Sequence, residues 1–177
     1  CKQKTAYELS LGLVGAEMCI RDSIQIIGFL ILLFSLKDEF PIGTAIWQSA
    51  FHAVSGFNNA GFVILPNSNS ISSFSNNLAL ILPMTLLIIF GALSYSIWID
   101  MFRYRRFSKF TLDSKLVLIF TVLLIFMGSA VLFISEYSNP LTFGELSFFD
   151  KVISSIFHSI SGRTAGFTTV DLSLIHI

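Results

Sequence analysis

The chain has 177 residues, of which 54% are hydrophobic and only 12% charged, and its mean hydropathy is +0.77. Soluble domains carry about 25% charged residues, so this composition argues against a soluble domain and is typical of a chain that lies in lipid. The formal net charge is zero, which argues against a nucleic-acid partner, because such partners require clustered positive charge.

Both ends of the chain carry strings that differ from the rest. Residues 1–23 and 172–177 resemble translated sequencing adapters, and we expect that the native gene does not encode them. Both cysteines, Cys1 and Cys19, lie in the first string, so cysteine usage says nothing about the redox compartment. The alternatives are a genuine amphipathic N-terminus or a signal peptide, but residues 1–23 lack the unbroken apolar stretch of a signal peptide.

The next segment combines a short apolar run with a short helix. Residues 24–36 are apolar but too short to cross a bilayer, which needs about 20 residues. We therefore expect them to be the end of an outer transmembrane helix. A polar turn follows, and Thr44 can cap a helix over residues 44–56. This helix has only about three turns, which suits a segment that enters the membrane and returns better than one that spans it.

Residues 78–101 are the first stretch long enough to cross the bilayer completely, and we expect an inner helix there. Pro83 and Gly91 lie inside it, and both are tolerated in membrane helices where neighbouring groups satisfy the backbone. Residues 102–115 follow as a short loop rich in arginine and lysine. The positive-inside rule predicts that this basic loop is cytoplasmic.

The second half repeats this order of elements. Residues 116–134 form another apolar crossing, and residues 135–150 form a polar loop without lysine or arginine. A second short helix is expected over residues 148–162, followed by an extended segment at 164–168. Because the basic loop is expected to be cytoplasmic, both short helices should enter the membrane from the outside.

A short motif occurs at the end of both short helices. The pattern F-H-x-[V/I]-S-G, then two or three residues, then A-G-F, occupies residues 51–62 and 157–167. The copies lie about 105 residues apart, and an internal repeat indicates a duplicated structural unit. A single A-G-F is weak evidence, but two copies behind the same helix end favour a shared function over ordinary glycine turns.

These residues resemble the Trk/Ktr/HKT family of potassium transporters. Residues 57–62 are similar to the second pore loop of that family, and residues 163–171 are similar to the third. The resemblance implies an all-α membrane protein of repeated helix–re-entrant loop–helix units, of which the family has four. It assigns residues 24–101 to the second unit and residues 116–171 to part of the third, so the expected fold is incomplete.

The resemblance implies potassium translocation through a filter of backbone carbonyls. A potassium ion sheds its water where carbonyl oxygens replace it, and glycine lets successive carbonyls turn inward because it has no Cβ atom. We call residues 58–62 the first filter segment and residues 164–168 the second. The C-terminal end of each preceding helix carries partial negative charge, which also favours a cation. The expected ion-binding residues are Asn59, Ala60, Gly61, Phe62, Thr164, Ala165, Gly166 and Phe167.

Two histidines, His52 and His158, occupy equivalent places in the repeat. An alternative function is a membrane-embedded enzyme that uses them as metal ligands or bases. Such enzymes usually place Asp, Glu or His within true crossings, and residues 78–99 and 116–134 contain none. We therefore expect the histidines to hydrogen-bond within their helices, and we expect neither an enzyme nor a cofactor.

The resemblance also implies partners. The full-length protein is expected to form a homodimer in the cell membrane and to bind a cytosolic regulatory subunit that binds nucleotides. The sequence leaves open whether sodium or protons are coupled to potassium transport.

Overall fold

The computed structural model describes residues 6–65, 77–137, 139 and 147–168. Within this part of the chain the regular structure is entirely helical. Residues 66–76 and half of the polar loop expected over residues 135–150 lie outside the described residues. The helices are α1 (Ala6–Leu36), α2 (Ile42–Phe57), α3 (Leu78–Ala92), α4 (Tyr95–Tyr104), the short 3-10 helix η2 (Phe107–Lys109), α5 (Leu112–Glu136) and α6 (Phe148–Thr164).

The membrane-spanning candidates are α1 and α5. Residues 18–36 of α1 and all of α5 are long and apolar enough to cross a bilayer, and α3 with α4 counts as a third span if the pair is one broken crossing. Large apolar side chains are exposed along α5, among them Ile119, Phe126 and Val131. A helix that is apolar all round is typical of a membrane span, and the expected all-α membrane fold is confirmed.

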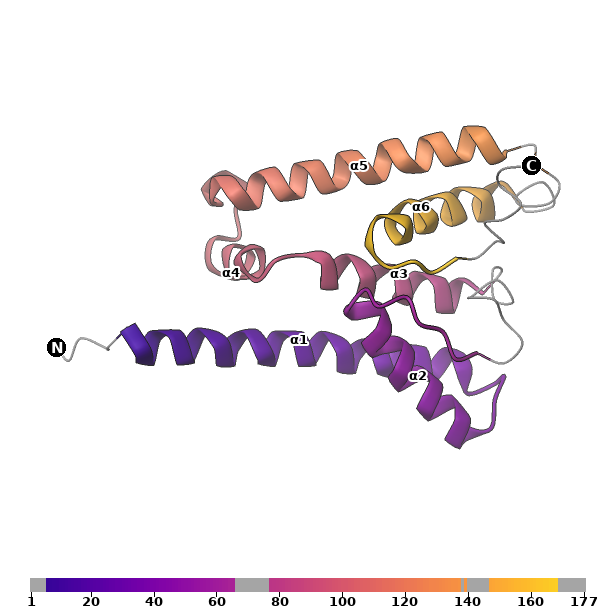
Figure 1. Cartoon of the computed structure of the whole chain (residues 1–177), viewed down its shortest axis with the longest axis horizontal. Coiled ribbons are helices and arrows are strands. Elements are labelled where there is room, and N and C mark those ends of the chain that lie inside the picture. The colour runs from indigo at the N-terminus through magenta and orange to yellow at the C-terminus, as the bar shows by residue number, and fades with distance from the viewer. Residues whose placement is uncertain (1–5, 66–76, 138, 140–146, 169–177) are drawn as a thin grey trace.

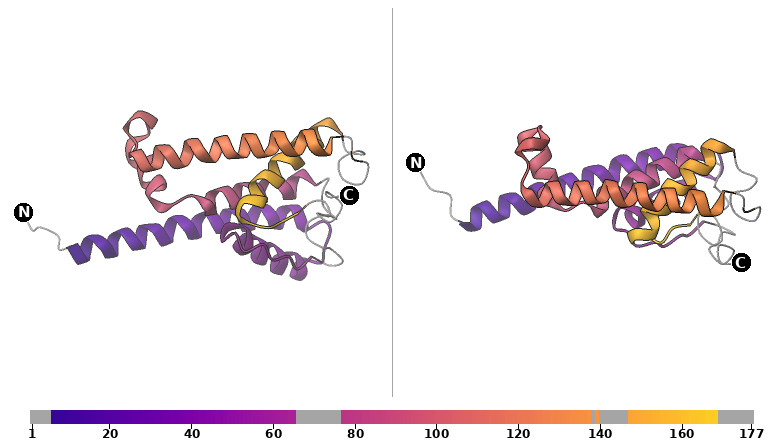
Figure 2. Two further views of the ribbon diagram at one scale, coloured as in Figure 1. Left: turned by 45° about the horizontal axis from the view of Figure 1, so that its top comes forward. Right: turned by 90° about the horizontal axis from the view of Figure 1, so that it is seen from above.

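The two short helices expected from the repeat are α2 and α6, and they lie beside the long helices α1 and α5, respectively (Figures 1 and 2). Helix α2 packs on α1 and α3, whereas α6 packs on α5 and also on α3. Both short helices thus share one apolar core. Its buried members are Leu32, Leu36, Ala45, Ala53, Phe57, Leu80, Ile81, Met84, Leu87, Ile88, Phe157, Ile160, Ala165 and Phe167.

The helix boundaries differ from the expected ones by a few residues. Helix α2 begins at Ile42, and the Pro41 carbonyl accepts its first backbone hydrogen bond from the Ala45 N–H at 2.9 Å. Thr44 therefore lies within the first turn and does not cap the helix, because proline already restricts the backbone at the entry to the helix. Helix α1 is continuous, so residues 6–23 lie in the same helix as the expected outer-helix end at 24–36.

Helix α3 continues through Pro83 without a break. The proline ring removes the N–H group that would otherwise bond to the carbonyl of Ala79. The Ser35 hydroxyl of α1 donates a hydrogen bond to the Ala79 oxygen at 2.7 Å. A neighbouring helix therefore satisfies the carbonyl that proline leaves free, which is the usual condition for proline inside a membrane helix.

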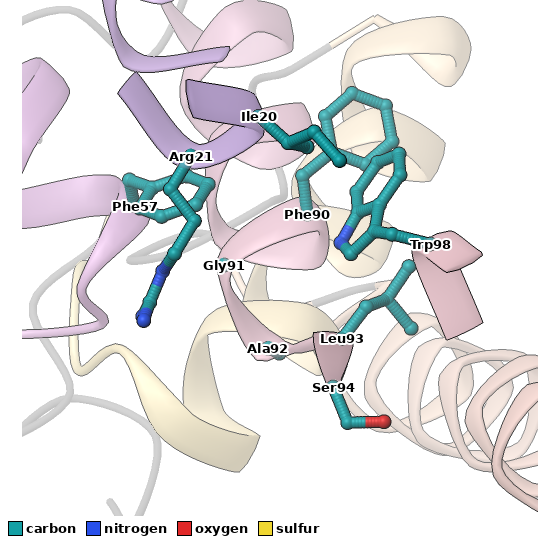
Figure 3. A pocket seen from close by; sticks show the side chains of 9 residues that line it. All are labelled: Ile20, Arg21, Phe57, Phe90, Gly91, Ala92, Leu93, Ser94 and Trp98. Carbon is teal, nitrogen blue, oxygen red and sulfur yellow. The ribbon is translucent and has the colours of Figure 1, made fainter. Parts of the chain in front are cut away.

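The expected inner helix over residues 78–101 is instead divided between α3 and α4, which meet at 98°. The backbone is extended at Leu93 and Ser94. Serine hydroxyls compete with helical backbone hydrogen bonds, and the Ser94 and Ser96 hydroxyls lie 2.9 Å apart. Across the bend, the Phe90 and Trp98 rings meet edge to face at 5.4 Å, beside a cavity of about 300 Å³ (Figure 3).

The hydroxyl beside Pro83 provides a stability test. Ser35→Ala should lower the free energy of unfolding by about 0.6–1.7 kcal/mol, the average and the maximum found for hydrogen bonds between membrane helices, because the Ala79 carbonyl loses its donor. Ser35→Thr keeps the hydroxyl and should lose less. Unfolding of the purified full-length protein in detergent would measure both variants, and equal stability of Ser35→Ala and wild type would contradict this role.

Candidate functional site

The two filter segments lie next to each other although they are far apart in the sequence. The Thr164 hydroxyl donates a hydrogen bond to the Asn59 side-chain oxygen at 3.2 Å, across 105 residues. A Cβ atom on Gly61 would overlap the backbone oxygen of Ala165 and would lie 3.7 Å from the Cα of Gly166. Backbone therefore meets backbone at the centre of the site.

Both glycines of the A-G-F motif adopt the same unusual backbone conformation. The φ angle is 75° at Gly61 and 76° at Gly166, a region that residues with a Cβ atom rarely adopt. Asn59 also has a positive φ, 53°, and asparagine is one of the few other residues enriched there. The repeat in the sequence therefore corresponds to a repeat in local backbone geometry.

The end of each short helix holds the filter segment that follows it. In the first repeat, the Ser55 carbonyl accepts a hydrogen bond from the Ala60 N–H at 2.9 Å. In the second, the Ser161 carbonyl accepts from the N–H groups of Ala165 and Gly166, at 2.8 and 3.0 Å. These bonds direct backbone N–H groups of each filter segment toward its own helix, which limits how the segment's carbonyls can be arranged.

Ser55 and Ser161 contact the candidate site, and the sequence analysis did not single them out. The Ser55 hydroxyl donates to the Phe62 carbonyl at 2.9 Å, and the Ser161 hydroxyl donates to the Phe167 carbonyl at 2.6 Å. Both side chains are buried. The signal was present in the sequence, because both serines fill the S of the repeated S-G pair.

The environment of the predicted site residues differs between the two segments. Phe167 is only 1% exposed and belongs to the shared core, whereas Phe62 is 69% exposed. Ala165 is buried, while Ala60, Thr164 and Gly166 are exposed. The second segment is therefore anchored in the core through its phenylalanine, and the first is anchored mainly through backbone contacts.

The histidines lie on the short helices rather than in the filter segments. His52 is buried, and its Nδ1 lies 2.7 Å from the Gln48 carbonyl one turn earlier, within hydrogen-bond distance. His158 is also buried, at the equivalent place on α6. Among the described residues, no group of three or more His, Cys, Asp or Glu side chains is arranged to hold a metal ion.

Comparison with known proteins identifies relatives of this chain. A family model described as "TrkH: Cation transport protein" matches residues 18–177. The chain is 37% identical over 161 residues to the Ktr system potassium uptake protein B of Bacillus subtilis, covering 91% of this chain and 36% of that protein. It is 38% identical over 148 residues to the potassium/sodium uptake protein NtpJ of Enterococcus hirae, covering 84% of this chain and 32% of that protein.

A third relative, the Ktr system potassium uptake protein B of Vibrio alginolyticus, is 35% identical over 151 residues, which cover 84% of this chain and 33% of that protein. The chain thus spans about a third of the length of each of these relatives. The family model, in contrast, covers most of the chain, including both short helices and both filter segments. The chain belongs to the TrkH family of cation transport proteins.

Proposed function

We propose that the full-length protein carries potassium ions across the cell membrane and that the two filter segments form two of the four sides of its selectivity filter. The observation that carries this proposal is the meeting of two glycines with matching positive φ angles at one site, Gly61 against the backbone of Ala165 and Gly166. The printed names of the relatives, potassium uptake and potassium/sodium uptake proteins, support the choice of ion.

The chemistry of the site suits a potassium ion. Four such segments around one axis would offer rings of carbonyl oxygens in place of the hydration shell. The side-chain oxygens of Asn59 and Thr164 lie at the start of the two segments and contact each other, so they would add neutral oxygen atoms beside the carbonyls. The site residues proposed for the ion remain residues 59–62 and 164–167.

The finer features of transport are also proposals. Sodium is the favoured second ion, because one relative is named a potassium/sodium uptake protein, although proton coupling remains the alternative. A homodimer and a cytosolic nucleotide-binding subunit are proposed on family resemblance. Membership of a cation transport family favours transport over an enzyme that uses His52 and His158.

Uptake by living cells would test the proposed function. A full-length gene that contains these segments should restore growth at low potassium and rubidium uptake to cells that lack other potassium uptake systems. A protein that reaches the membrane but leaves uptake at the level of the empty vector would refute the proposal. Purified protein that carries stoichiometric metal, lost in a His52→Gln, His158→Gln variant, would favour the enzyme alternative instead.

The arrangement of charges predicts the sidedness of the protein. The connection from α4 to α5, which carries the basic residues, lies at the opposite end of the molecule from the starts of α2 and α6 (Figure 1). In a full-length protein without other cysteines, Ser147→Cys should react with a membrane-impermeant maleimide on intact cells, whereas Ser108→Cys should react only after permeabilisation. Both serines are exposed, so the reverse pattern would invert the topology.

A further inference from the structure

Each filter segment is held at two points by a single serine at the end of its short helix. The carbonyl of Ser55 accepts from the Ala60 N–H at 2.9 Å, and its hydroxyl donates to the Phe62 carbonyl at 2.9 Å. The A-G-F tripeptide of the first repeat is therefore held at its first and last residues by one residue. We call this arrangement the serine clamp.

The second repeat contains the same clamp. The Ser161 carbonyl accepts from the Ala165 N–H at 2.8 Å, and the Ser161 hydroxyl donates to the Phe167 carbonyl at 2.6 Å. Ser161 is fully buried and Ser55 is 5% exposed. Water therefore competes little for either hydroxyl, and the carbonyl of the phenylalanine is its partner in both repeats.

The clamp is retained although the two loops differ in length. The hydroxyl and the phenylalanine carbonyl are separated by seven residues in the first repeat and by six in the second. Asn59, with its positive φ of 53°, lies within the longer loop, where the left-handed conformation lets the backbone turn tightly. The same contact made by loops of different length indicates that the clamp is a feature of the site and not of one turn type.

The clamp determines the direction of one carbonyl in each segment. A hydroxyl that donates to a carbonyl occupies one of its two lone pairs and turns the oxygen toward the donor. The phenylalanine carbonyls therefore face the short helices, whereas the Ala165 carbonyl faces Gly61 of the neighbouring segment.

We propose that Ser55 and Ser161 are positioning residues that hold the Phe62 and Phe167 carbonyls away from the ion and so decide which oxygens line the path. This inference rests on the proposed function. It removes the Phe62 and Phe167 carbonyls from the proposed ligands of the ion and leaves the carbonyls of residues 59–61 and 164–166. A filter in which these carbonyls were released would offer the ion a different set of oxygens, and discrimination between potassium and sodium depends on that set.

Transport by full-length protein in which the hydroxyl of Ser55 or Ser161 has been removed would test this inference. Ser55→Ala and Ser161→Ala should each lower the preference for rubidium over sodium by about five- to tenfold, the scale of one hydrogen bond. The effect should be larger for Ser161→Ala, because its hydrogen bond is shorter and its partner Phe167 is buried. Ser55→Thr and Ser161→Thr keep a hydroxyl and should therefore retain more of the preference for rubidium over sodium than the alanine variants do.

A matched control lies on the same helix. The Ser159 hydroxyl donates to the Ile125 carbonyl of α5 at 3.0 Å, and this contact is partly buried. Ser159→Ala therefore removes a contact between α6 and α5 without touching a filter segment. Ser159→Ala should change the amount of protein in the membrane, if anything, and leave sodium inhibition of rubidium uptake unchanged. Inhibition constants, which do not depend on the amount of protein, are the readout that a merely structural role would not alter.

The outcomes separate this inference from the proposed function. If wild type takes up rubidium and both alanine variants keep its sodium inhibition constant, the serine clamp has no positioning role, while the function stands. If wild type shows no uptake at all, the proposed function itself fails. If the Ser161→Ala protein does not reach the membrane, the sodium inhibition constants of Ser55→Ala and Ser55→Thr show whether the serine clamp has a positioning role.

Discussion

Replacing Gly61 with serine in the full-length protein should reduce potassium selectivity by tenfold or more. Two independent costs combine at this position. A residue with a Cβ atom pays about 1–2 kcal/mol to adopt a positive φ, and the added atom would overlap the backbone oxygen of Ala165 in the neighbouring segment. About 1.4 kcal/mol corresponds to a factor of ten in an equilibrium constant. We therefore expect the free energy of potassium binding, relative to that of sodium, to weaken by at least this amount.

The same substitution at Gly166 should have a smaller effect. Gly166 shares the positive φ, 76°, but a Cβ atom there meets nothing within 4 Å among the described residues. Gly162→Ser is a matched control on the same helix end. Gly162 has no positive φ, and an added Cβ atom there meets nothing within 4 Å in the part of the chain that the structure describes. Rubidium uptake with sodium competition would rank the three variants, and a Gly61→Ser protein with wild-type sodium discrimination would contradict the filter assignment.

Replacing Gly91 with alanine should destabilise the protein. Gly91 of α3 lies against the backbone carbonyl of Phe57 at the end of α2, and a Cβ atom would overlap that oxygen. Overpacking of this kind costs about 1–3 kcal/mol, and here the neighbour is backbone, which cannot turn aside as a side chain can. Helix α3 would have to move away from the short helix that carries the first filter segment.

Helix propensity alone predicts the opposite result at Gly91. Alanine is favoured over glycine inside a helix by about 1 kcal/mol. If helix propensity alone decided the result, Gly91→Ala would therefore stabilise the protein. Gly43→Ala serves as control, because Gly43 lies in α2 and no described residue comes within 4 Å of an added Cβ atom there. Thermal unfolding in detergent should show a lower midpoint for Gly91→Ala than for Gly43→Ala. The reverse order would show that this contact does not limit the packing of α3.

Local features of the chain could be predicted from the sequence. The two short helices follow from the length of their apolar segments, and their equivalence follows from the repeated motif. The unusual conformation of Gly61 and Gly166 was also predictable, because φ is a property of one residue and glycine tolerates positive values at little cost. A composition with 12% charged residues pointed to the membrane for a similarly direct reason.

The tertiary structure decided the features that depend on a partner far away in the sequence. Pro83 does not break α3, since Ser35 of another helix satisfies the free Ala79 carbonyl. The break lies instead at Leu93 and Ser94, beyond the contact between Gly91 and Phe57. The close approach of Gly61 to Ala165 depends likewise on how two distant loops pack. The sequence by itself determined which segments are alike, and packing between these segments decided which atoms meet, because each contact needs groups that only the fold brings together.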